Sequence, residues 1–220
     1  RSVSWLALSV SVSKVTTLLA LIVLGRYLGE EYFGRFAIAL ALPAALEAMA
    51  DLGISWALIR EGAHRRSELN ELAIGALIPK LLLACVMVGA TAALASILGL
   101  PAEVFEAAIY LAIARALDSV TYLARAVFQA TEQMQYDAAS YTLDGAVRLL
   151  LILYGAASGF GVIGFAKALV IASLITMGGT WLVTAHRFLR RPERIRLPVR
   201  LLAAGLPLTV VWFLDNAVIR

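Results

Sequence analysis

Six long apolar runs, separated by short polar connectors, dominate the hydrophobic pattern of the chain. A helix that crosses a bilayer needs about 20 mostly apolar residues. Each run reaches that length, and none alternates as the strands of a barrel do. Backbone groups in hydrocarbon must be satisfied within their own segment, so we expect helices. The runs are 5–24, 33–59, 72–98, 104–126, 138–157 and 162–186, and a seventh begins near residue 201.

The pattern predicts an all-α, polytopic transmembrane bundle with six spanning helices and the start of a seventh. We expect residues 1–190 to form this bundle, 191–200 to be a basic cytoplasmic linker, and 201–220 to begin a second bundle. Because the chain begins at Arg1 and stops at Arg220 inside an apolar run, we expect it to be a fragment of a longer protein.

The composition excludes an ordinary soluble domain. Hydrophobic residues make up 61% of the chain and charged residues 15%, against roughly half and a quarter in soluble domains. The net charge of +4 does not favour nucleic acid as a partner, because the arginines concentrate in short connectors. Cys85 is the only cysteine, so no disulfide framework or cysteine-based metal site is expected. We expect no cofactor.

The connectors predict the orientation of the chain. Short cytoplasmic loops carry an excess of lysine and arginine. The second connector contains Arg60, Arg65 and Arg66, and six arginines lie between residues 187 and 200. The connectors around Pro101 and Gly159 contain none. We therefore place the even-numbered connectors and the N-terminus in the cytoplasm, in a multi-pass protein of the cell membrane that contacts membrane lipids.

Several runs contain ionisable residues, which are costly inside a bilayer and are therefore functional candidates. On the second, fourth and fifth runs the charges recur every three or four residues, which places each set on one helical face. Helices with one polar stripe can satisfy it by turning it inward, around internal ion pairs or a wet cavity. The charges are Lys14, Glu47, Asp51, Lys80, Arg115, Asp118, Arg125, Asp144, Arg148, Lys167 and Asp215.

Three interpretations of these charges stay open: a water-filled substrate cavity, structural pairing alone, and a proton or sodium relay. Asp118 with Arg115 and Asp144 with Arg148 have the spacing of ion pairs along one helix. Lys14, Lys80 and Lys167 have no acidic residue at that spacing, so each needs water or a partner from another helix. Lys167 could instead extend to the membrane interface.

Four short elements occur in order along the chain. Residues 24–34 end the first run with Arg-Tyr-Leu-Gly, two glutamates and Tyr-Phe-Gly. The others are Asp51-Leu52-Gly53, the stretch 125–130, and the stretch 205–208 leading to Asp215. Together they resemble the polysaccharide-biosynthesis, or O-antigen-type, flippases of the multidrug/oligosaccharidyl-lipid/polysaccharide exporter superfamily.

This resemblance implies a two-lobed transporter, not an enzyme, in which two similar helical bundles face each other across a central cavity. The chain would be the N-terminal lobe, and the missing C-terminal lobe its partner. The implied cargo is a lipid-diphosphate-linked oligosaccharide or polysaccharide precursor, moved by alternating access. A coupling ion, H⁺ or Na⁺, is left open. Expected contacts to diphosphate or sugar are Lys14, Lys80 and Arg148; further cavity residues are Arg115, Asp51, Asp118 and Asp144.

Other functions are retained as alternatives. A cation-coupled multidrug exporter of the same superfamily predicts a cavity dominated by acids. A membrane-embedded enzyme acting on lipid-linked sugars needs an acidic residue in an extracytoplasmic loop, where Glu103 and Glu106 are candidates apart from Glu30 and Glu31. A purely structural membrane subunit is the third alternative.

Overall fold

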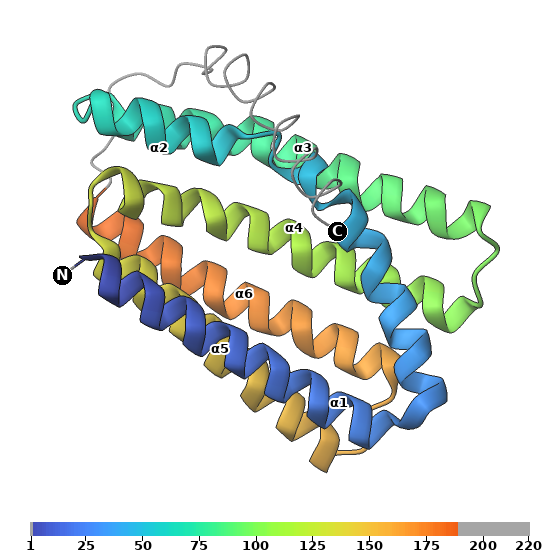
Figure 1. Ribbon diagram of the computed structural model, residues 1–220. Coiled ribbons are helices and arrows are strands. Elements are labelled where there is room, and N and C mark those ends of the chain that lie inside the picture. The colour runs from blue at the N-terminus through green and yellow to red at the C-terminus, as the bar shows by residue number, and fades with distance from the viewer. Residues whose placement is uncertain (1, 189–220) are drawn as a thin grey trace.

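The computed structural model describes residues 2–188, with side chains from Lys14 onward. All regular structure in this part of the chain is helical, which confirms the predicted all-α class. The helices form one elongated bundle (Figure 1). They are α1 (Ser2–Leu46), the 3₁₀ helix η1 (Glu47–Ala50), α2 (Ile54–His64), α3 (Leu69–Ile97), α4 (Ala102–Ala130), α5 (Met134–Ala157) and α6 (Val162–Arg187).

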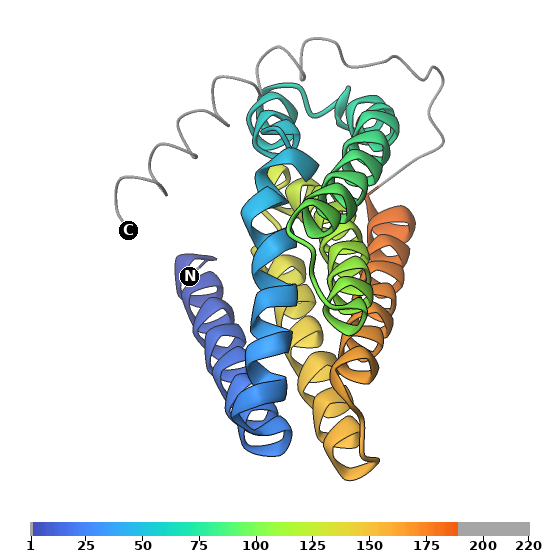
Figure 2. The same cartoon turned by 90° about the vertical axis from the view of Figure 1, so that its right-hand side faces the viewer.

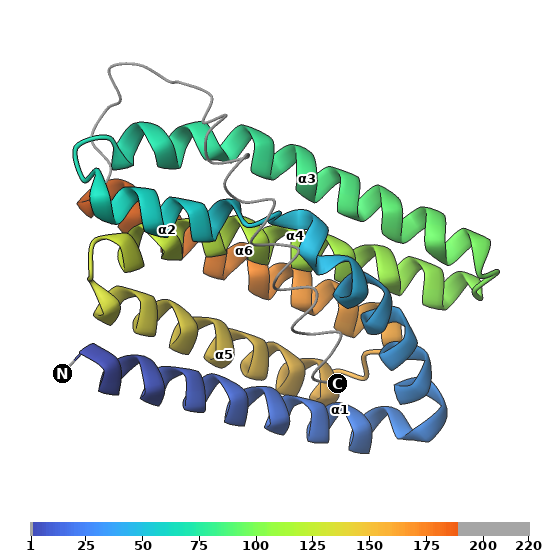
Figure 3. The ribbon, with the colours of Figure 1, turned by 45° about the horizontal axis from the view of Figure 1, so that its top comes forward.

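A bend at Gly29 divides α1 into two helical halves. Gly29 has φ 72° and ψ 174°, a conformation that a side chain would strain. The chain turns back there, so that the first half of α1 and the half after Gly29 lie apart as two helices (Figures 2 and 3). They correspond to the first predicted run and to the beginning of the second.

The second predicted run, 33–59, is not one continuous helix. Its α-helix ends at Leu46, η1 follows, and α2 begins at Ile54. The break has a conformational cause, because Leu52 has φ 42° and Gly53 has φ 72°, both in the left-handed region. The interruption places Asp51 in a turn.

Four helical stretches among the described residues are long and apolar enough to cross a membrane: Lys14–His64, Leu69–Ile97, Ala102–Ala130 and Val162–Arg187. The first joins the first two predicted runs. Helix α5 has 24 residues, about 36 Å, but is not among these four stretches. A multi-pass helical chain is therefore supported, whereas a total of six spans remains a prediction. The expected linker 191–200 and the start of a second bundle lie outside the described residues.

The turns α2–α3 and α4–α5 and the end of α6 lie at the same end of the bundle as the start of α1 (Figure 1). This is the arrangement that the connector charges predict. The Gly29 bend and the turns α3–α4 and α5–α6 lie at the other end, which we call the Gly29 end. That the first end faces the cytoplasm remains a prediction.

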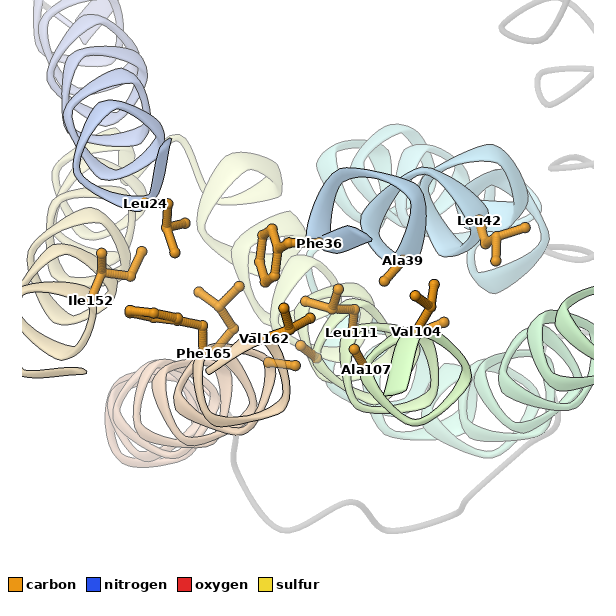
Figure 4. Close-up of a cluster of buried hydrophobic side chains, with 14 of the residues drawn as sticks. Leu24, Phe36, Ala39, Leu42, Val104, Ala107, Leu111, Ile152, Val162 and Phe165 are labelled. Atoms are coloured by element: carbon orange, nitrogen blue, oxygen red, sulfur yellow. The ribbon is translucent and has the colours of Figure 1, made fainter. Parts of the chain in front are cut away.

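An apolar cluster joins α1, α4, α5 and α6 (Figure 4). Leu24, Phe36, Ile152 and Phe165 point into it from three of these helices. Helix α4 contributes small residues, including fully buried alanines, that allow close approach of its neighbours. This cluster packs the bundle near the Gly29 end.

Candidate functional site

A cavity of about 510 Å³ lies inside the bundle, walled by α1, η1, α4 and α5 with single contributions from α2, α3 and α6. The charged faces expected from the sequence meet on its wall. Six of the seven residues proposed as cavity residues line it: Asp51, Lys80, Arg115, Asp118, Asp144 and Arg148.

Lys80 of α3 is completely buried and anchors the broken segment between α1 and α2. Its ammonium group donates to an Asp51 carboxylate oxygen and to Ser55 Oγ, the latter over 2.8 Å. Ser55 Oγ in turn donates to Asp51 over 2.6 Å. Charge pairing and two hydrogen bonds compensate for removing the lysine from water. Lys80 was expected to need water or a partner from elsewhere in the bundle. That partner is Asp51, in the turn between η1 and α2.

Arg148 of α5 joins three helices. It forms ion pairs of 2.6 Å with Asp118 of α4 and 2.9 Å with Asp144 of its own helix. Ser173 of α6 donates to the same Asp118 oxygen over 2.8 Å. The Asp144–Arg148 spacing therefore produces the ion pair considered from the sequence, and the guanidinium also bridges to α4.

Arg115 and Asp118 do not pair along α4. Arg115 forms an ion pair of 3.4 Å with Glu47 at the start of η1, and both side chains are partly exposed. Asp118 is taken by Arg148. The spacing along one helix was a poor guide here because both residues face other helices across the cavity.

Arg125, about two turns beyond Asp118 on α4, also lines the cavity and is only 7% exposed. Its Nε donates to Ser140 Oγ over 2.9 Å, and its Nη2 to the Ser140 carbonyl over 3.2 Å. Its guanidinium lies 3.9 Å from the ring centre of Tyr141. The periodic pattern of α4 includes Arg125, but Arg125 is not among the residues that the sequence places in the cavity.

Lys14 does not join the cavity. Its side chain is exposed, and it is not part of the cavity wall. Lys167 lies elsewhere, near the Gly29 end, where it forms a half-exposed ion pair of 3.7 Å with Glu106 of α4. The structure therefore does not bring Lys14 onto the wall with Lys80 and Arg148, and its contact with the cargo remains a prediction.

The cavity wall is divided into a charged part and an apolar part. Four basic and four acidic side chains line it, so neither sign dominates. The apolar part belongs to the cluster near the Gly29 end, with Leu24, Phe36, Ile152 and Leu169. Within residues 2–188, no group of three histidine, cysteine or acidic side chains is placed to hold a metal ion.

A family model described as polysaccharide biosynthesis protein matches residues 1–215. The chain belongs to this family. The resemblance drawn from the short sequence elements is therefore confirmed. No match was found among curated proteins.

Two solved structures share the fold of this polysaccharide biosynthesis family member. One is a MOP superfamily transporter from Pyrococcus furiosus Vc1, described as having a binding pocket of reverse polarity that suggests a different function; the identity is 20% and the TM-score 0.71. Another is a MATE in complex with MaD5, at 19% identity and a TM-score of 0.72. The chain is covered to 95% in each comparison, and the two relatives to 52% and 51%. The chain thus spans about half their length.

Proposed function

We propose that the chain is one lobe of an exporter that moves a lipid-linked oligosaccharide or polysaccharide precursor across the cell membrane by alternating access. Membership of the polysaccharide biosynthesis family supports a saccharide cargo. The similarity to about half of each transporter chain supports a second lobe that faces this one. In such transporters, one bundle rocks against the other around a central site.

The observation that carries the proposal is the divided cavity. Polar groups are expensive to move through hydrocarbon. A wall with eight charged side chains offers hydrogen bonds to a diphosphate and sugars. The apolar wall near the Gly29 end offers contact to hydrocarbon. A cavity with both kinds of wall fits an amphiphilic cargo whose lipid tail stays in the bilayer.

The test is transport by the full-length protein in proteoliposomes, with a fluorescent lipid-diphosphate oligosaccharide as cargo. Ser119→Trp would fill the cavity from α4, and Thr17→Trp would fill it from α1, because both residues line the wall. Leu82→Trp is the control, since Leu82 is 63% exposed on α3 and outside the cavity.

We expect each cavity-filling variant to lower the rate of translocation about tenfold or more, and the control to transport like the wild type. Monodispersity and thermal unfolding of each variant establish that it is folded. Transport by folded Ser119→Trp and Thr17→Trp at the wild-type rate would contradict the proposal.

A second candidate is cation-coupled multidrug export by the same cavity. Its support is the likeness to a MATE fold together with the four acidic side chains on the wall. The same proteoliposomes, loaded with a fluorescent organic cation and given a proton or sodium gradient, separate the two functions. Gradient-driven export of the cation without transport of the glycolipid would favour this second candidate.

A further inference from the structure

The basic side chains of the cavity differ in whether they have an acidic partner. Lys80 is bound by Asp51, Arg115 by Glu47, and Arg148 by two aspartates. Arg125 is the exception, because no described carboxylate lies within ion-pair distance of it. Three of the four cavity cations are therefore neutralised by the protein itself.

Neutral groups hold Arg125 in place. Its guanidinium has five N–H donors, of which Ser140 accepts two. Ser140 is itself fixed by Thr180 of α6, with 2.8 Å between the two hydroxyl oxygens. The Tyr141 ring covers one face of the guanidinium. The side chain is thus held by α5 directly, and by α6 through Ser140, without losing its charge.

Asp137 attracts Arg125 at longer range but does not form an ion pair with it. Asp137 lies at the start of α5, and its carboxylate accepts a hydrogen bond of 2.9 Å from Gln129. It does not reach ion-pair distance from Arg125. An almost completely buried cation without a carboxylate in direct contact is unfavourable, so an anion that enters the cavity would gain a strong partner.

We propose that Arg125 is the oxyanion-binding residue of the cavity, with the hydroxyls of Tyr122 and Tyr141 beside it as neutral donors. All three residues line the wall. A guanidinium binds phosphate and carboxylate through two parallel hydrogen bonds. The ligand is therefore a phosphate of the cargo or the carboxylate of an acidic sugar. This inference rests on the proposed function and moves anion recognition from Lys80 and Arg148 to Arg125.

The experiment measures binding of pyrophosphate and of glucuronate to the detergent-solubilised full-length protein by isothermal titration calorimetry. The two ligands distinguish the phosphate source from the carboxylate source. We expect Arg125→Gln to weaken binding of the preferred ligand about tenfold or more, because a charge-assisted bidentate contact is lost. Arg125→Lys keeps the positive charge but lacks the planar guanidinium. Its affinity for the ligand should lie between those of the wild type and Arg125→Gln. Lys167→Gln, away from the cavity, is the control.

A folded Arg125→Gln protein that binds both ligands like the wild type would overturn the inference, as would a wild-type protein that binds neither. If Arg125→Gln does not fold, Arg125→Lys decides by its thermal unfolding. The preferred ligand should raise the melting temperature of the wild type more than that of this variant, and equal shifts would overturn the inference.

The proteoliposome assay separates this inference from the proposed function. If the wild type transports the glycolipid and Arg125→Gln binds anions as the wild type does, the proposed role of Arg125 is contradicted and the proposed function is supported. If anion binding depends on Arg125 but the wild type does not transport the glycolipid, the proposed role of Arg125 is supported and the proposed function is contradicted.

Discussion

Lys80 of α3, which has no exposed side-chain surface, forms an ion pair with Asp51 in the turn between η1 and α2. The pair ties the interrupted part of the second predicted run to the neighbouring helix. Asp51 keeps 24% of its side chain exposed and lines the cavity. One interaction thus places a carboxylate at the cavity and accommodates a buried lysine.

The two partners of this pair should not be equivalent in a stability measurement. Asp51→Asn leaves a fully buried charge and should destabilise the protein by about 3 kcal/mol, whereas Lys80→Met leaves a partly hydrated carboxylate and should cost about 1–2 kcal/mol. The double variant should be more stable than the sum of the two effects implies. Thermal unfolding in detergent measures all three, and strictly additive losses would count against the buried pair.

A half-exposed pair at the Gly29 end should contribute much less. The Arg35 guanidinium lies 2.8 Å from a carboxylate oxygen of Glu103 on α4, with side-chain exposures of 37% and 32%. It also lies 2.6 Å from an oxygen of the more exposed Glu31. Solvent-exposed pairs contribute about 0.2–1 kcal/mol. We expect Arg35→Gln to lower the free energy of unfolding by less than about 1 kcal/mol, as measured by the same unfolding assay. A loss comparable to that of Asp51→Asn would show that the pair is structurally essential.

Two glycines provide a matched test of the packing. A Cβ added to Gly155 of α5 would lie 2.8 Å from a Phe160 ring carbon and 2.9 Å from one of Phe165. Gly155→Ala should therefore destabilise the protein by about 1–3 kcal/mol. Gly178 of α6 has no atom within 4 Å of the added Cβ, so Gly178→Ala should be neutral or stabilising by up to about 1 kcal/mol. Equal melting temperatures for the two variants would contradict this packing.

Asp137 lies in the connector between the fourth and fifth predicted runs, and burial there raises the pKa of its carboxyl group. A carboxyl group whose pKa is higher in the folded than in the unfolded state binds more protons when folded. Stability therefore falls as the pH rises from the ordinary pKa toward the raised one. Asp137→Asn should remove this loss.

The measurement is the melting temperature across pH 4 to 8 for the wild type, Asp137→Asn, and the control Glu132→Gln, whose side chain is exposed in the same connector. Asp137→Asn should gain stability relative to the wild type as the pH rises above about 4. The control should follow the wild type. A constant difference between Asp137→Asn and the wild type across this range would contradict the raised pKa.

The periodic charges were the most informative part of the sequence. The three-and-four spacing of Arg115, Asp118 and Arg125 on α4 placed them on one face, and the structure turns that face toward the cavity. Asp144 and Arg148 on α5 behave in the same way. A charged face on a membrane helix is costly against lipid and therefore turns toward the protein interior. The spacing alone was thus sufficient to predict which residues face the cavity.

The sequence could not show which partner each charge would find. Glu47 with Arg115, and Asp51 with Lys80, are pairs between segments far apart along the chain. They depend on the break after Leu46, which the apolar run 33–59 concealed. Gly53 was the available signal for that break, because it adopts the left-handed conformation that glycine tolerates.

The central claim, that the charged faces share a hydrated interior, is tested most directly by cysteine labelling in the full-length protein. Ser119→Cys places a thiol of nearly the same size on the cavity wall, in a chain with its other cysteines removed. The matched control retains only Cys85, which is exposed on α3 outside the cavity wall and lies in an apolar stretch. A membrane-impermeant maleimide is supplied on both sides of the membrane. We predict that Ser119→Cys is labelled while Cys85 is protected by lipid, and labelling of Cys85 without labelling of Ser119→Cys would contradict a water-filled cavity.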